Sequence, residues 1–133
     1  MSHRVIAWLM GLAALTFGIA SALHFDIHIT IGSLVIQGES FRNAAIPEAI
    51  IGAVVAAGTI AWISRSHQGA VLALSTTVVA ILGVCIGLYE VTLGDAVRNT
   101  ADVVYHVCVL ALLLVILYGV STTFRASRLA NSS

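Results

Sequence analysis

Five ionisable side chains of this chain could take part in chemistry at a common site: His24, Glu48, Glu90, Asp102 and His106. Imidazoles and carboxylates are the groups that exchange protons, orient polar ligands and bind metal ions. Asp102 and His106 are four residues apart, so on a helix they share one face, where the carboxylate can orient or charge the imidazole. These residues predict a polar site near one end of the elements that carry them.

Two tyrosines, Tyr89 and Tyr105, lie beside these groups in the sequence and complete the set of candidate ligand-binding residues. We predict no catalytic residue, because the chain contains no GxSxG, GxxxxGK or HExxH motif. The sequence does not decide whether the chain is an enzyme, and the absence of these motifs favours a protein without catalytic activity.

Two other functions are compatible with the same residues. In a metal- or haem-binding protein, His24 and His106 would be ligands from two different elements, with Glu48 as a further ligand or partner. Two isolated histidines have no diagnostic spacing, so no cofactor is required. In a proton-coupled transporter, Asp102 and His106 would relay protons, but such proteins usually place an acid near the bilayer midplane beside a broken helix.

The elements that must position these residues are four long apolar stretches, at 5–23, 46–63, 70–89 and 103–120. Each is close to the ~20 residues that a helix needs to cross a bilayer. Hydrophobic residues make up 59% of the chain and charged residues 9%, which is too apolar for an ordinary soluble domain. We therefore predict an all-α integral membrane protein, with residues 1–133 forming one four-helix transmembrane domain.

The loop between the first two stretches has its own pattern. Ile27, Ile29 and Ile31 alternate with polar residues before a Gly32-Ser33 break, which predicts a short β-hairpin. We expect it to cover the mouth of the bundle, with the lipid headgroups as the alternative location. Pro47 is suited to the first turn of a helix, so the second span is expected to begin there.

Charged residues divide between the two sides of the predicted bundle. The basic side carries Arg4, Arg65, Arg125 and Arg128. The acidic side carries Asp26, Glu39, Glu48, Glu90, Asp95 and Asp102, and only Arg42 and Arg98 break the pattern. Because basic residues in short loops stay cytoplasmic, we expect both termini inside a bacterial-type inner (plasma) membrane. The formal net charge is zero, which gives no reason to propose nucleic acid as a partner.

The first stretch has a second interpretation, as a secretory signal cleaved after Ala20-Ser21-Ala22. Its apolar run is longer than the ~7–15 residues usual in such signals, so we expect an uncleaved helix.

Small residues recur along the first three stretches, and we expect Gly18 and Gly83 to mark close contacts between helices. The same residues could instead form the face of a homo-oligomer. Besides the lipid bilayer, the expected partner is a small hydrophobic or amphipathic ligand, or a partner protein in a larger membrane complex, bound near the outer face. We therefore predict a small polytopic membrane protein that binds such a partner without catalysis.

Overall fold

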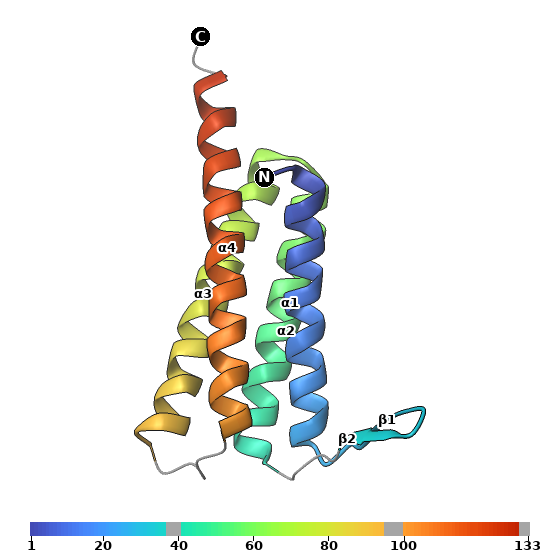
Figure 1. Cartoon of the computed structure of the whole chain (residues 1–133). Coiled ribbons are helices and arrows are strands. Elements are labelled where there is room, and N and C mark those ends of the chain that lie inside the picture. Colours follow the sequence, from blue (N-terminus) through green and yellow to red (C-terminus); the bar gives the residue numbers. More distant parts are fainter. Residues whose placement is uncertain (37–40, 95–99, 131–133) are drawn as a thin grey trace.

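The structure, a computed structural model, describes residues 1–36, 41–94 and 100–130, and every side chain within them except those of Leu34 and residues 127–130. These residues form four antiparallel helices (Figure 1), and each is long and apolar enough to cross a membrane. The helices are α1 (His3–His24), α2 (Arg42–Ile63), α3 (His67–Thr92) and α4 (Thr100–Ala130). The predicted membrane-length helices are confirmed. The described part of the chain does not include Glu39, Asp95, Arg98 or the side chain of Arg128.

Serine side chains start two of the helices. Ser2 caps α1 by accepting a hydrogen bond from the Val5 N–H at 3.3 Å, and Ser66 caps α3 in the same way from Gly69 at 2.9 Å.

Helix α2 begins earlier than its proline suggested. The expected start at Pro47 is wrong, because the helix begins at Arg42 and contains Pro47 in its interior. The N–H of Phe41 donates to the His24 carbonyl at 2.8 Å, which ties the start of α2 to the end of α1. Proline has no N–H, so the Asn43 carbonyl receives no helical hydrogen bond from residue 47.

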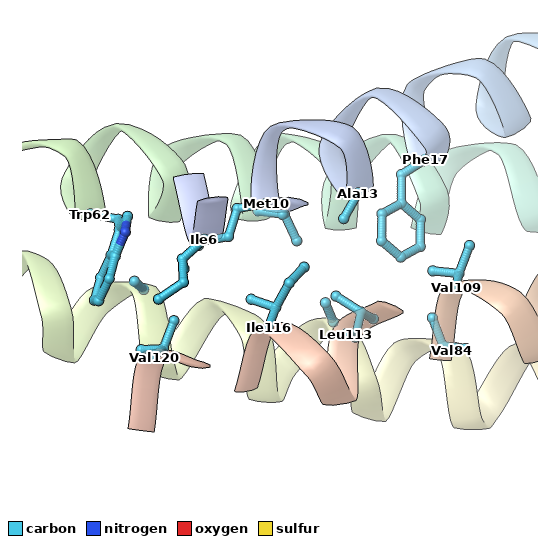
Figure 2. Packing of buried hydrophobic residues seen from close by; sticks show 13 residues of the cluster. Ile6, Met10, Ala13, Phe17, Trp62, Val84, Val109, Leu113, Ile116 and Val120 are labelled. Atoms are coloured by element: carbon cyan, nitrogen blue, oxygen red, sulfur yellow. The ribbon is translucent and has the colours of Figure 1, made fainter. Parts of the chain in front are cut away.

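Each helix packs against the next along the chain, and α1 also contacts α4, which closes the bundle. A continuous apolar core runs between the helices (Figure 2). Its largest fully buried side chains are Phe17, Ile6, Met10, Leu113, Ile116, Val55, Val84 and Val120. At one end Trp62 completes the core, and its indole N–H donates to the His3 carbonyl at 3.1 Å.

Glycines set the closest approaches between helices. A Cβ atom added at Gly52 would lie 3.1 Å from the Phe17 Cβ, and one at Gly58 would lie 3.0 Å from the Thr76 Cβ. At Gly83 a Cβ would overlap the end of the Ile51 side chain, so this position is a close contact with a side chain and not the near-backbone contact that was expected. The Gly18 backbone does lie at the α1–α2 contact, because its N atom would be 3.6 Å from a Cβ added at Gly52. A Cβ at Gly18 itself would meet nothing within 4 Å, so the expectation that a larger side chain there pushes the helices apart is wrong, and Gly52 is the position without room for one.

The hairpin forms but does not cover the bundle. Strands β1 (Ile29–Ile31) and β2 (Leu34–Ile36) pair antiparallel, and Figure 1 shows them projecting sideways from the end of α1. Asp26 has a left-handed backbone (φ 65°) directly after α1, and this residue turns the chain away from the helix axis. The predicted position over the mouth is therefore wrong, and Ile31 is 65% exposed.

The two ends of the bundle differ in charge. We call the end that carries Asp26, Glu48, Glu90 and Asp102 the acidic end, and the end that carries Arg4, Arg65 and Arg125 the basic end. Helix α4 extends past the other helices at the basic end (Figure 1).

We expect Gly52→Leu to lower the melting temperature in mild detergent, with a cost of about 1–3 kcal/mol, because the larger side chain must push α2 away from α1. Gly18→Leu is the matched control, since it makes the same change on the same pair of helices where space is open. Equal melting temperatures for the two variants would show that Gly52 does not mark a tight contact.

Candidate functional site

The fold brings the five ionisable candidates to the acidic end. His24 is the last residue of α1, Glu48 lies in the second turn of α2, and Glu90 is near the end of α3. Asp102 and His106 occupy the first two turns of α4. All five line one cavity of about 420 Å³.

His24 and Glu48 form a hydrogen-bonded pair across α1 and α2, which becomes an ion pair when His24 is protonated. The His24 Nδ1 donates to the Glu48 Oε2 at 2.7 Å, and the two side chains are 16% and 9% exposed. The Ser21 hydroxyl supports the same junction by donating to the Ala45 carbonyl at 2.8 Å. The sequence identified both members of the pair but gave no local signal that they would meet, because 24 positions and the hairpin loop separate them.

His106 is held by the backbone of its own helix. Its Nδ1 donates to the Asp102 main-chain carbonyl at 2.7 Å, so the expected contact with the Asp102 carboxylate is replaced by one with the backbone. The carbonyl can only accept, which leaves Nε2 of the neutral ring as an acceptor. This atom faces Gly87 of α3, where a Cβ would overlap it. Gly87 is thus a site residue that the sequence analysis did not identify.

The cavity lies mainly between the halves of α2 and α3 near the acidic end, and α1 and α4 each contribute two lining residues. Besides the five ionisable residues, it is lined by Phe17, Phe41, Asn43, Ala44, Pro47, Ile51, Gly83, Val84, Ile86, Gly87 and Val91. Ile86 lines the cavity and is also 65% exposed, so the cavity borders an exposed apolar surface of the bundle. Its lining combines five ionisable side chains with apolar ones such as Phe17, Ile51 and Val84.

Negative charge dominates the polar part of this cavity. Glu48, Glu90 and Asp102 can each carry a carboxylate charge, and the only basic side chains in the lining are the two imidazoles. No arginine from the described part of the chain lines it. Asn43 adds an amide and, through Pro47, a backbone carbonyl that lacks its usual helical donor.

The two tyrosine candidates do not line the cavity. Tyr89 is 57% exposed on α3 and faces away from it. Tyr105 packs against the core and places its ring edge-on to His106, with the ring centres 5.1 Å apart. Its buried hydroxyl has no hydrogen-bond partner within the described residues. A buried hydroxyl without a hydrogen-bond partner is costly in a protein interior. The residue directly before His106 therefore carries an unsatisfied polar group.

The metal-binding alternative gains no support from the geometry. His24 is paired with Glu48 and His106 with a carbonyl, and nowhere in residues 1–36, 41–94 and 100–130 do three His, Cys, Asp or Glu side chains converge closely enough to hold a metal ion.

Comparison with known proteins gives no relative from which a function could be transferred: no protein-family model, curated protein or solved structure matches this chain.

A double-mutant cycle would test whether His24 and Glu48 stabilise the bundle as a pair. We expect His24→Ala and Glu48→Ala each to destabilise the protein, and the double variant to lose less than their sum, with a coupling free energy of about 0.5–3 kcal/mol. Thermal unfolding in mild detergent would provide the values. Additive losses would show that the two side chains act independently.

Proposed function

We propose that this chain is a non-catalytic membrane protein that binds a small amphipathic molecule in the cavity at its acidic end. The observation that carries the proposal is the lining of that cavity, which combines three acidic side chains with apolar walls and includes the exposed apolar Ile86. A ligand with a polar head and an apolar tail matches both kinds of side chain, because binding pockets combine apolar walls with a few placed polar groups.

The charges of the lining narrow the chemistry of the head group. Glu90 lies on α3, Asp102 lies one turn before His106 on α4, and Glu48 lies on α2, so acids from three helices line the cavity. A head group that donates hydrogen bonds or carries positive charge would complement these acceptors, whereas an anionic head would be repelled. We therefore propose an amphipathic amine or a similar hydrogen-bond donor as the class of ligand.

The apolar walls indicate where the tail would lie. Ile51 of α2 and Gly83 of α3 contact each other and both line the cavity. Ile86 and Pro47 border it nearer the acidic end. A tail leaving between α2 and α3 would meet hydrocarbon chains of the bilayer without crossing a polar barrier.

Dodecylamine, dodecanol and dodecanoate, which share one tail and differ in the head group, are suitable probes. We expect dodecylamine to bind protein-containing phosphatidylcholine nanodiscs saturably in calorimetry, at least about tenfold more tightly than dodecanoate. Ala44→Phe should fill the cavity and weaken this binding, while Ala53→Phe on the exposed face of the same helix should not. Empty nanodiscs correct for partitioning. Equal binding by both variants would contradict the proposal.

We further propose that the protein lies in a bacterial-type inner membrane, with the basic end and both termini in the cytoplasm. The support is the distribution of charge among the described residues: Arg4, Arg65 and Arg125 lie at the basic end, whereas the acids and only one arginine, Arg42, lie at the acidic end. The cavity and the hairpin would then face the outer side.

Cysteine accessibility tests this orientation. In a Cys85→Ala, Cys108→Ala background, Ser33→Cys in the hairpin turn should react with an impermeant thiol reagent in intact cells. Gln68→Cys at the start of α3 should react only after the cells are permeabilised. The reverse pattern would place the acidic end in the cytoplasm.

A further inference from the structure

A second cavity, of about 380 Å³, lies at the basic end of the bundle. All four helices or their connections contribute to it. Its lining consists of His3, Trp62, Arg65, Ser66, His67, Ala70, Thr123 and Phe124. It shares no residue with the cavity at the acidic end and has no part in the proposed function.

The polar groups of this second cavity are basic or hydrogen-bond donors. Arg65 provides a guanidinium group, and His3 and His67 provide two imidazoles. Every carboxylate side chain among the described residues belongs to the opposite end, so no acid neutralises this cluster. A cavity with this charge balance is complementary to an anion.

Aromatic contacts hold the imidazoles at the cavity wall. His3 stacks on Trp62 with the ring centres 4.6 Å apart, and its Nε2 lies 2.9 Å from the Trp62 carbonyl. His67 lies 5.2 Å from the ring centre of Phe124 on α4. These contacts hold the two rings in place, whereas Arg65 is an exposed side chain that a bound ligand would have to order.

Arg65 occupies an unusual backbone position. It has a left-handed conformation (φ 56°) in the turn between α2 and α3, where glycine is the residue that adopts such angles without strain. The chain thus has an arginine where folding alone favours glycine. This gives a variant, Arg65→Gly, that should preserve or improve folding while removing the charge.

We infer that the basic-end cavity binds a phosphate group. Planar guanidinium groups match phosphate oxygens through paired hydrogen bonds, and the adjacent imidazoles add donors when protonated. Located at the helix ends, the cavity lies at headgroup depth, so a phospholipid with a net negative head can supply the phosphate, as can a soluble phosphate compound.

Trp62 gives a local signal for the test, because the chain has only one other tryptophan, Trp8, which is 80% exposed. In a Trp8→Phe background in neutral maltoside detergent, we expect dihexanoyl-phosphatidylglycerol to change Trp62 fluorescence saturably. Dihexanoyl-phosphatidylcholine, whose choline offsets the phosphate charge, should not. Inorganic phosphate distinguishes the sources: affinity similar to that of the lipid indicates a soluble ligand, and much weaker affinity indicates a headgroup.

The variants separate binding from folding. Arg65→Gln and Arg65→Gly should each weaken phosphatidylglycerol binding about tenfold or more, and Arg65→Gly should keep the wild-type melting temperature. Arg4→Gln removes the same charge at the same end but outside the cavity, so it should change the affinity less than about twofold, as expected for a screened distant charge. Equal effects of Arg65→Gln and Arg4→Gln, equal binding of the two lipids, or no saturable signal would each overturn the inference.

Discussion

Between apolar helices in a bilayer there is no hydrophobic effect to draw them together, so the distance at which their backbones can pack decides the architecture. In this chain glycines on α2 and α3 set that distance. Gly52 packs against α1, Gly58 packs against Thr76 of α3, and Gly83 packs against the side chain of Ile51 of α2. These contacts fix the middle of the bundle. The space that remains between α2 and α3 towards the acidic end is the candidate binding cavity.

At the acidic end, polar contacts add to the packing of the helices. Gly87 leaves room for the His106 ring, which a Cβ at this position would displace. The His24–Glu48 pair and the Phe41 N–H bond to the His24 carbonyl connect α1 to α2 around the same space. Ionisable groups are costly within a membrane unless they pair or face a cavity; here all five line the cavity, and His24 and Glu48 also pair with each other. The cavity thus forms where glycines determine the spacing of the helices and the His24–Glu48 pair connects α1 to α2.

Much of the fold could be predicted because long apolar stretches and a period of two are local signals. The four helices and the hairpin follow from them, as does the location of the ionisable residues at one end. Other features depend on contacts between distant segments. Gly18 belongs to a regular stripe of small residues, yet α2 packs beside it through Gly52. Likewise, nothing near Asp26 in the sequence indicates that its left-handed backbone turns the hairpin away from the bundle. The two cavities could not be predicted, because each requires side chains from several helices.

The proposed ligand site can be tested most directly by locating the bound tail. A dodecylamine with a photoactivatable diazirine on its chain, irradiated in protein-containing nanodiscs, would label the residues that it touches, and mass spectrometry of the peptides would identify them. We predict adducts concentrated on Ile51 and Ile86 that disappear when excess dodecylamine is added. Adducts spread over lipid-facing residues such as Trp8 and Ile60, and unaffected by the competitor, would contradict the existence of a specific site.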